Sequence, residues 1–453
     1  MDRTRAMNRL VDNTAGRVSI CTLGCKVNQY ESAQLGTLLV IGGYTVSMGE
    51  HRGADLYVVN TCTVTGSTDA QARQLVRRII RLNPGAPVLV TGCYAQVSPD
   101  VFRAVKGVCG VLGQTDRGRI IQYVDRLFGR PAANAGKVLP EWPIPSFPHR
   151  TRAFVKVQDG CDGGCSYCII PRARGPSRSR QPGSIVEEVR TLAREGHREA
   201  VITGVHLGLY GRDLSPRQNL AGLMRELGSQ CGMPRLRVSS LDPMELSPPI
   251  VEWLASCPPA CPHIHISLQS GDNGVLRQMN RGYTAEDFRK IVRELILRIP
   301  DLAVGVDVMA GFPGEDEAAF RRTYCLLEDL PLAYFHVFPF SPRPGTPAAQ
   351  FPHQVKPARI RRRCEVLRRL GKKKRKDFAS RFIDRCLPVL VESNRDLTTG
   401  MLRGFTPNYI PVMFPGPDDW MNREIGVTIR EVHGALVFGH PHELISGEKT
   451  YHG

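Results

Sequence analysis

The chain has 453 residues, which at roughly 100–200 residues per domain is enough for about two to four domains whose cores need no disulfides. Hydrophobic residues make up 42% and charged residues 23%, a balance that excludes disordered, collagen-like and coiled-coil proteins, and no apolar stretch approaches the ~18–20 residues of a membrane span. The net charge of +17 indicates a polyanionic partner, with nucleic acid as the first candidate.

Residues 16–130 alternate short β-rich runs with helical ones, which predicts a parallel-sheet βα domain. The predicted strands are Val18 to Cys21, Leu56 to Asn60 and Val88 to Thr91, and the predicted helices are Glu31 to Ile41, Thr68 to Leu82 and Pro99 to Val105. Residues 131–150 contain Pro131, Pro140, Pro143, Pro145 and Pro148, so we interpret them as a linker.

A second βα domain is expected over residues 151–380. Its six predicted strands are Ala153 to Val157, Ala200 to Thr203, Leu236 to Ser240, His263 to Leu268, Ala303 to Met309 and Tyr334 to Phe340, and its clearest helices are Ser184 to Arg194, Ala285 to Arg298 and Ile360 to Arg375. Six βα units predict an open, partial version of the eight-stranded barrel, with its chemistry at the C-terminal strand ends.

Short, turn-separated strands follow in residues 384–446 and predict a small antiparallel β-barrel. They are Leu387 to Glu392, Gly400 to Phe405, Tyr409 to Phe414, Ile425 to Val432 and Leu436 to His440. The predicted fold class is therefore α/β: a parallel-sheet domain, a partial (βα)6 barrel and a small β-barrel.

The strongest chemical signal is the Cys-x3-Cys-x2-Cys run of Cys161, Cys165 and Cys168, placed just after the first strand of the second domain. With no secretion signal at the start of the sequence we expect a cytoplasmic protein, in which the 14 cysteines are more consistent with metal ligation or catalysis than with disulfides. Three thiolates at this spacing can bind one face of an iron–sulfur cluster. Structural zinc is the weaker alternative, because it needs a fourth ligand and the next candidate is His197.

This run, with an aromatic residue before its last cysteine and at the first strand of a partial barrel, closely resembles the radical S-adenosylmethionine (SAM) superfamily. The resemblance implies a 4Fe-4S cluster whose open iron chelates SAM, and an electron that cleaves SAM to a 5′-deoxyadenosyl radical. It further implies SAM contacts from Tyr167 beside the adenine, and from Thr203, Gly204, Ser267, Gln269 and Asp307. One departure is Gly164, which stands where the family usually has an aromatic residue.

Three more cysteines, Cys25, Cys62 and Cys93, each follow a predicted strand of the first domain. Because parallel strands end at one edge of their sheet, these side chains can converge there. The spacing alone is a weak signal, since a single cysteine is more often a buried small residue than a ligand. Three at equivalent turns, each beside Gly or Thr, favour a shared site.

The words around these cysteines are Leu-Gly-Cys25-Lys-Val-Asn-Gln-Tyr-Glu-Ser, Asn-Thr-Cys62-Thr-Val-Thr and Thr-Gly-Cys93-Tyr-Ala-Gln. Together with Cys161 to Arg180 they resemble the methylthiotransferases over nearly the whole chain, a radical SAM family with an N-terminal auxiliary-cluster domain, a radical barrel and a C-terminal TRAM domain. Most similar is the branch called MtaB, which adds a methylthio group to C2 of N6-threonylcarbamoyladenosine beside the tRNA anticodon. The isopentenyladenosine and ribosomal-protein branches carry different residues after the first cysteine.

The resemblance implies that Cys25, Cys62 and Cys93 hold a second 4Fe-4S cluster, which carries the sulfur to be transferred. Two SAM molecules are then used per turnover: one methylates that sulfur, and the other supplies the radical that attacks C2. The partners so implied are tRNA and an electron donor such as flavodoxin or ferredoxin, with no membrane. The oligomeric state is left open.

The segment Lys356 to Lys376 contains 12 basic residues and one acidic residue, Glu365, on a predicted amphipathic helix. Such a run is often only a solvated face, but its density favours phosphate contact, and the expected RNA contacts there are Lys372, Lys373, Lys374, Arg375 and Lys376. A second expected set is Arg172, Arg174, Arg178 and Arg180, which could reach phosphates or the threonyl carboxylate of the modified base.

The predicted C-terminal barrel carries little positive charge, because residues 387–453 include five basic against eight acidic residues. We therefore expect it to contact tRNA through aromatic and polar residues such as Phe405 and Tyr409.

Two alternatives remain open. The same chemistry could act on isopentenyladenosine in tRNA or on an aspartate of a ribosomal protein. In a different class, a non-catalytic iron–sulfur protein for RNA binding or electron transfer would also explain the cysteines and the charge, and would form no 5′-deoxyadenosine.

Overall fold

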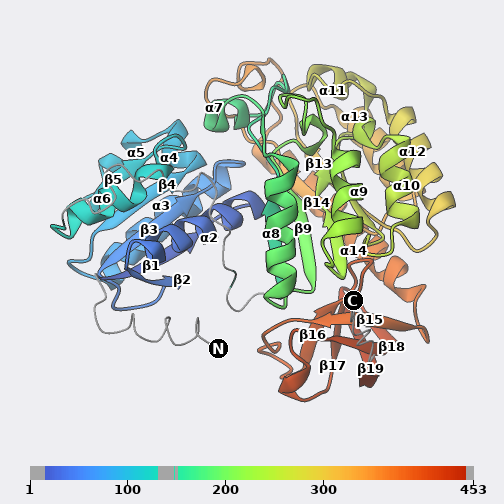
Figure 1. Cartoon of the computed structure of the whole chain (residues 1–453). Coiled ribbons are helices and arrows are strands. Elements are labelled where there is room, and N and C mark those ends of the chain that lie inside the picture. The colour runs from blue at the N-terminus through green and yellow to red at the C-terminus, as the bar shows by residue number, and fades with distance from the viewer. Residues whose placement is uncertain (1–15, 131–146, 148–150, 445–453) are drawn as a thin grey trace.

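The computed structural model describes residues 16–130, Phe147 and residues 151–444. Figure 1 shows three parts: an N-terminal α/β unit, a larger barrel-like unit beside it, and a small β-barrel below the second unit. The predicted linker lies almost entirely outside the described residues. Within the described part of the chain, no helix is long and apolar enough to cross a membrane.

The N-terminal unit is a five-stranded parallel sheet in the order β2-β1-β3-β4-β5. Its strands are β1 (Arg17–Thr22), β2 (Thr45–Met48), β3 (Leu56–Thr61), β4 (Val88–Gly92) and β5 (Val108–Leu112). Its helices are α2 (Lys26–Ile41), α3 (Gly66–Leu82), α4 (Cys93–Val97), α5 (Asp100–Arg103) and α6 (Ile120–Leu127), with the 3-10 turn η1 (Arg117–Arg119) before α6.

Separate apolar cores form on the two faces of this sheet. Leu35, Leu38 and Leu39 of α2 pack with Ile121 and Val124 of α6 on one face. Side chains of α3, α4 and α5 pack against the other face, so the sheet is covered on both sides. All three predicted strands are present, whereas the sequence pattern missed β2 and β5, which are only partly buried.

The central unit contains all six predicted parallel strands. They are β6 (Arg152–Lys156), β9 (Glu199–Thr203), β10 (Arg235–Val238) continued by β11 (Ser240–Leu241), β12 (His263–Gln269), β13 (Ala303–Ala310) and β14 (Tyr334–Pro339). Pairing runs β6-β9-β10 and β11-β12-β13-β14, so the sheet curves into a partial barrel that has β6 and β14 as its two edges.

Helices cover the outside of this partial barrel (Figure 1). They are α8 (Pro182–Arg194), α9 (Leu220–Gln230), α10 (Pro248–Ser256), α11 (Asn273–Gln278), α12 (Ala285–Arg298), α13 (Glu317–Asp329) and α14 (Pro357–Ser380). The short helix α7 (Ile170–Arg174) instead faces α4 of the N-terminal unit. The short strands β7 (Gln158–Asp159) and β8 (Arg178–Ser179) pair with each other, and the 3-10 turns are η2 (Leu207–Leu209), η3 (Pro243–Glu245) and η4 (Pro347–Ala349).

The C-terminal unit is a closed barrel in the order β15-β16-β17-β19-β18. Its strands are β15 (Cys386–Val391), β16 (Leu402–Phe405), β17 (Pro411–Phe414), β18 (Glu424–His433) and β19 (Leu436–Leu444), with the 3-10 turn η5 (Asp418–Trp420). The predicted α/β class, with a parallel-sheet domain, a partial barrel and a small β-barrel, is confirmed.

The β-barrel closes the N-terminal end of the partial barrel. Buried Arg237 on β10 donates to both carboxylate oxygens of Glu199 at 2.7 and 3.0 Å and to the carbonyl oxygen of Pro407 at 2.9 Å. Tyr409 packs against His263 with ring centroids 4.7 Å apart, and Arg152 lies 4.4 Å from the ring centroid of Phe405. Both rings pack into this interdomain contact and stay partly exposed, so the expected RNA contact of Phe405 and Tyr409 remains a prediction.

Candidate metal centres and nucleic-acid interface

Cys161, Cys165 and Cys168 lie on the loop between β7 and α7, and all three are partly accessible. The loop turns sharply at Gly160, whose φ of +71° suits glycine, and an added Cβ there would lie 1.9 Å from the carbonyl oxygen of Pro176. At Gly164 an added Cβ would lie 2.8 Å from Nδ2 of Asn280, which donates to the Gly164 carbonyl. Asn280 thus fills the space beside the residue that departs from the family pattern.

Polar side chains surround these thiols, and among them Arg281, Asp242 and Glu245 were not predicted from the sequence. His206 Nδ1 lies 3.2 Å from Cys161 Sγ, and its Nε2 lies 2.5 Å from Glu245 Oε1. Arg281 donates to Cys165 Sγ at 3.4 Å and to Asp242 Oδ1 at 2.5 Å. His206 follows the second barrel strand, where active-site residues of such barrels lie, and that position is the only sequence signal that could have singled it out.

Most of the predicted SAM contacts lie at the C-terminal strand ends above the barrel. Tyr167 packs edge-on against Phe312 with centroids 6.4 Å apart, and Thr203 accepts a hydrogen bond from Ser239 at 3.3 Å. Gly204 follows β9, while Ser267 and Gln269 close β12, with Gln269 at φ +63°. Asp307 differs, because it sits in mid-strand on β13 and its carboxylate contacts imidazoles.

Cys25, Cys62 and Cys93 lie at the C-terminal ends of β1, β3 and β4, as the topology predicts. Cys25 is exposed and is the N-cap of α2, while buried Cys93 is the first residue of α4. Burial and, to a smaller extent, the neighbouring Cys25 thiol raise the pKa of Cys62 to about 12. Gly24 has φ +107°, and an added Cβ would lie 2.8 Å from Cys62 Sγ.

Both cysteine sets fit a polynuclear group better than a single ion. A mononuclear zinc ion binds each sulfur at ~2.3 Å and so draws its ligand atoms close together. The groups whose three ligand atoms lie within 4.8 Å of one another in the described residues are His265, Asp307 and His336, and His206, Asp242 and Glu245; neither includes a cysteine. Three thiols with wider spacing suit one face of a cuboidal iron–sulfur cluster.

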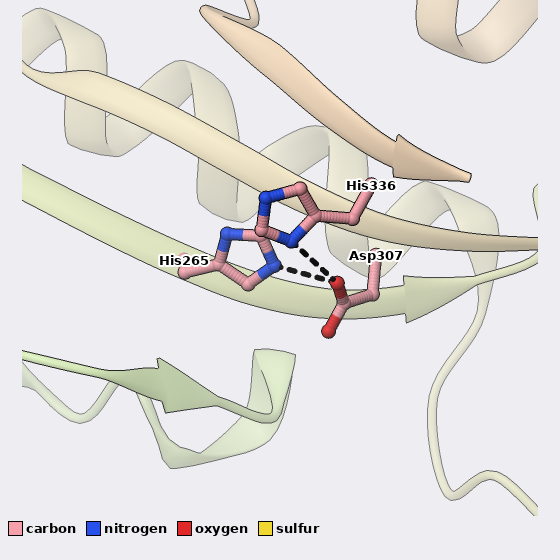
Figure 2. A group of neighbouring side chains, drawn as sticks. All are labelled: His265, Asp307 and His336. Carbon is pink, nitrogen blue, oxygen red and sulfur yellow. Dashed lines mark hydrogen bonds and ion pairs between the residues drawn. The ribbon is translucent and has the colours of Figure 1, made fainter. Parts of the chain in front are cut away.

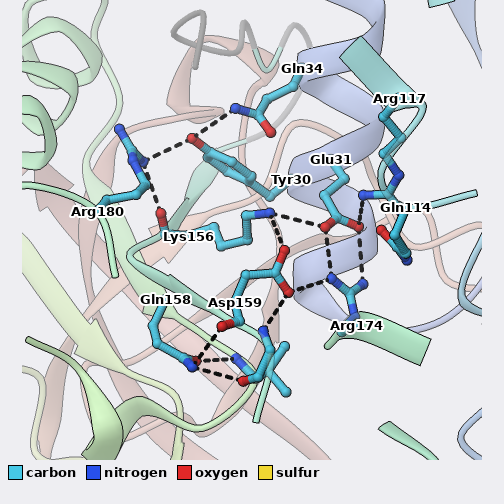
Figure 3. A network of polar contacts seen from close by, with 12 residues as sticks. Tyr30, Glu31, Gln34, Gln114, Arg117, Lys156, Gln158, Asp159, Arg174 and Arg180 are labelled. Carbon is cyan, nitrogen blue, oxygen red and sulfur yellow. Dashed lines mark hydrogen bonds and ion pairs between the residues drawn. The ribbon is translucent and has the colours of Figure 1, made fainter. Parts of the chain in front are cut away.

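A buried ionic network joins the two cysteine-bearing regions (Figure 3). Glu31 of α2 accepts from Lys156 at 3.0 Å and from Arg174 at 2.8 and 3.0 Å, and pairs with Arg117 at 2.5 Å. Asp159, two residues before Cys161, accepts from Lys156 at 2.9 Å and from Arg174 at 2.8 Å. The loop before Cys161, the helix after Cys168 and the helix after Cys25 thus share one set of charges.

The network also touches the first set of cysteines. Arg174 donates to Asn28 Oδ1 at 2.8 Å, and Asn28 in turn donates to the carbonyl oxygens of Leu23 and Thr61 on either side of the site. Gln114 donates to Cys93 Sγ at 3.4 Å. Burial alone would raise the pKa of Glu31, but Arg117, Arg174 and Lys156 outweigh it and hold that pKa well below its ordinary value of 4.5.

Two of the arginines predicted to contact RNA are buried in the structure. Arg174 is 4% exposed and Arg180 7% exposed, and Arg180 is paired with Glu188 at 2.7 Å, so the prediction that these two arginines contact RNA is wrong. Arg172 and Arg178 are exposed. Arg172 also donates to the carbonyl oxygen of Pro344 at 2.9 Å.

The basic segment at Lys356 to Lys376 forms much of α14, which buries Cys364, Leu367 and Leu370 against the barrel. Its exposed basic residues are Lys356, Arg359, Arg361, Arg362, Arg368, Arg369, Lys372, Lys373 and Lys376. Lys374 instead donates to the carbonyl oxygen of Leu330 at 2.7 Å and to that of Glu328, and Arg375 lies 5.3 Å from the ring centroid of Tyr334. Within the described residues, Lys372, Lys373 and Lys376 have no such contact with the rest of the protein.

Comparison with known proteins agrees with this geometry. Residues 155–327 match the model of the Radical SAM superfamily, and residues 17–113 match that of the uncharacterized protein family UPF0004. A threonylcarbamoyladenosine tRNA methylthiotransferase MtaB from Bacillus subtilis is 38% identical, with 96% of this chain and 98% of that protein covered. An MtaB from Aquifex aeolicus is 36% identical over 91% of this chain and 99% of its own length.

More distant relatives share the architecture. A tRNA-2-methylthio-N(6)-dimethylallyladenosine synthase from Pelotomaculum thermopropionicum is 30% identical over 90% of this chain and 94% of its own. The solved structure of the radical SAM methyltransferase TsrM from Kitasatospora setae superposes with a TM-score of 0.52 at 18% identity over 73% of each chain, which shows a common fold. The chain is an enzyme that belongs to the radical S-adenosylmethionine methylthiotransferase family, and it resembles the MtaB branch.

Proposed function

We propose that this enzyme converts N6-threonylcarbamoyladenosine next to the tRNA anticodon into its 2-methylthio derivative. The observation that carries the proposal is the single buried network of Glu31, Asp159, Lys156, Arg117 and Arg174, which ties the two cysteine-bearing regions together. Such a network suits a reaction in which two metal centres work on one substrate. The similarity to MtaB proteins supports the choice of substrate.

Cys161, Cys165 and Cys168 would hold the 4Fe-4S cluster that the radical SAM family implies, and Cys25, Cys62 and Cys93 would hold a second one. When bound, these clusters and SAM supply an electron, a radical source and a sulfur carrier, which an inert aromatic C–H bond at C2 requires. Tyr167, Thr203, Gly204, Ser267 and Gln269 would contact SAM at the strand ends. Asp307 sits in mid-strand on β13 and contacts His265 and His336 (Figure 2), so it is not among the proposed SAM contacts.

The chain itself positions the reactants and excludes water. Gly24 and Gly160 let the two loops fold tightly around their cysteines, and His206 and Arg281 place polar hydrogens beside Cys161 and Cys165. The exposed cations of α14, together with Arg172 and Arg178, would bind tRNA phosphates. An electron donor such as flavodoxin or ferredoxin would feed the clusters, and a cytoplasmic location stays a prediction.

The test is an anaerobic reaction of the reconstituted enzyme with SAM, a chemical reductant and tRNA that carries N6-threonylcarbamoyladenosine. We expect the 2-methylthio nucleoside together with 5′-deoxyadenosine. Cys161→Ala should abolish both products, whereas Cys325→Ala, at an exposed cysteine of α13, should leave both unchanged. Absence of 5′-deoxyadenosine would favour a non-catalytic iron–sulfur protein, and product only from isopentenyladenosine tRNA would change the substrate.

A further inference from the structure

A cavity of about 650 Å³ lies between α3 and the edge of the N-terminal sheet. One wall is α3, which contributes five polar side chains: Gln71, Gln74, Arg77, Arg78 and Arg81. The opposite wall is the end of β1 and the turn after β2, with Leu23 and Glu50. Since α3 packs against β3 and β4, the β2 side of this face stays open and forms a groove, here called the α3 groove.

The α3 groove carries positive charge that the protein does not neutralise. Arg78 pairs with Glu50, the only carboxylate among the described lining residues. Arg77 and Arg81 are exposed, and within the described part of the chain neither forms an ion pair or a hydrogen bond. Because these two arginines are one helical turn apart, they share one face of α3. Two unpaired cations in a row along a groove favour a ligand with repeated negative charges.

The α3 groove also borders the loop that carries Cys25. Leu23 in its wall is followed directly by Gly24 and Cys25. The N–H of Leu23 donates to the carbonyl oxygen of Asn60 at 2.9 Å, near the end of β3 and just before Cys62. Cys25 itself is exposed. A chain molecule that lies in the groove would therefore continue to the place where the second cluster is proposed.

The N-terminal end of α3 is anchored to the barrel. The N–H of Gly66 donates to Ser341 Oγ at 3.1 Å, and buried Arg343 pairs with Asp69 at 2.7 Å. Ser341 and Arg343 follow β14, the strand that packs against α14. These contacts fix the α3 groove relative to α14, which carries the other exposed set of cations.

An RNA strand suits this groove better than an acidic protein does. A guanidinium fork matches the oxygens of a phosphate group. The exposed amides of Gln71 and Gln74 in the same wall offer hydrogen bonds to riboses and bases. Because the arginines line a concave surface, the ligand has to project its charges into it, as an extended phosphodiester backbone does and a flat protein surface does not.

We propose that the α3 groove binds the phosphodiester backbone of the tRNA anticodon loop where it flanks the target adenosine. This inference rests on the proposed function, because it takes tRNA as the partner. Arg77 and Arg81 each pair with one phosphate, while Arg78 remains paired with Glu50. Such contacts do not depend on the base sequence. They position the loop beside the second cluster and leave the choice of base to other residues.

The experiment measures binding of the reconstituted enzyme to an anticodon stem-loop at several salt concentrations. Arg77→Gln combined with Arg81→Gln should weaken binding about 10-fold at low salt, the effect of two exposed ion pairs, and should reduce the salt slope by about 1 to 2. Arg77→Lys combined with Arg81→Lys keeps both charges and should keep the wild-type slope. Arg126→Gln, at an exposed arginine of α6 on the opposite face of the sheet, should bind as the wild type does.

Neutral linkages in the RNA locate the contact. In a series of stem-loops, each with one methylphosphonate in place of one loop phosphate, the wild type should lose affinity at one or two positions. The double glutamine variant should lose nothing further at those positions, because the arginines that pair with them are already gone. Iron and sulfide contents are measured alongside, since the groove borders the Cys25 loop. Arg81→Gln alone serves as the second variant, because Arg81 lies at the end of α3 away from the cysteine-bearing strand ends.

Full affinity with an unchanged salt slope in the double glutamine variant would overturn the inference. So would neutral linkages that weaken wild type and variant alike at every position. Slower reduction of the clusters by flavodoxin, with RNA binding unchanged, would assign the groove to an acidic protein instead. Failure of the proposed function looks different: the wild type would form no methylthio product, while its binding of the stem-loop would still depend on Arg77 and Arg81.

Discussion

Replacement of Glu31 by glutamine should loosen the contact between the N-terminal unit and the barrel. The Glu31 side chain is 2% exposed and faces three cations, of which Lys156 and Arg174 are also 2% exposed. Removing this charge leaves Asp159 as the carboxylate that still pairs with Lys156 and Arg174. Loss of one partner from a buried ionic group costs about 3–5 kcal/mol, and we expect the lower part of that range because the glutamine amide still accepts hydrogen bonds.

Hydrogen exchange of the α2 and α7 amides measures this loss directly. A cost of about 3 kcal/mol corresponds to local opening that is about 100-fold more frequent. The matched control is Glu50→Gln, because Glu50 pairs with Arg78 on the surface of the same unit at 38% exposure, where an ion pair contributes about 0–1 kcal/mol. Equal exchange in the two variants would refute the view that this network holds the two units together.

The pH dependence of protein stability independently tests the direction of the Glu31 pKa shift. The pKa of Glu31 is held well below 4.5 in the folded protein, so its charge stabilises the fold above pH 4.5 and loses that effect as pH falls toward the folded value. The difference in stability between wild type and Glu31→Gln should therefore be full at neutral pH and shrink in acid. A difference that grows on acidification would contradict the assignment.

Three further predictions follow from the sites. Alanine at Cys25, Cys62 or Cys93 should halve the iron content and abolish methylthio transfer while 5′-deoxyadenosine still forms; unchanged iron would exclude a second cluster. Glutamine at Lys372, Lys373 and Lys376 together should reduce the salt slope of tRNA binding by about 2 to 3, measured by titration at several salt concentrations, whereas Lys374→Gln should mainly lower thermal stability because that lysine binds the last carbonyls of α13. Gly24→Ala should lower iron content, since its Cβ would lie 2.4 Å from Cys62 Cβ at φ +107°, while Gly118→Ala in open space should not.

Local sequence patterns explain which strands and which cysteine groups could be predicted. The six barrel strands are short apolar runs, and the Cys161, Cys165 and Cys168 cluster lies within eight residues, so both are visible in one stretch of sequence. Cys25, Cys62 and Cys93 could be grouped because parallel topology places strand ends at one edge. β2 and β5 were missed because neither strand is fully buried, so their hydrophobic pattern is weak.

Ion pairs between residues on different elements explain why the burial of the two arginines could not be predicted from the sequence. Arg174 and Arg180 have the appearance of RNA-binding arginines in sequence, but their partners Glu31 and Glu188 lie on other elements, and Glu31 is 143 residues from Arg174. No spacing rule joins Arg174 to Glu31, because the docking of α2 against the barrel brings them together.

The most direct test of the account is mass spectrometry of nucleosides in tRNA from cells with and without this gene. The account predicts that 2-methylthio-N6-threonylcarbamoyladenosine disappears without the gene and returns with the wild-type enzyme, but not with Cys93→Ala. Persistence of that nucleoside, with loss of 2-methylthio-isopentenyladenosine instead, would contradict the proposed substrate. No change in either nucleoside would contradict the proposed reaction on tRNA.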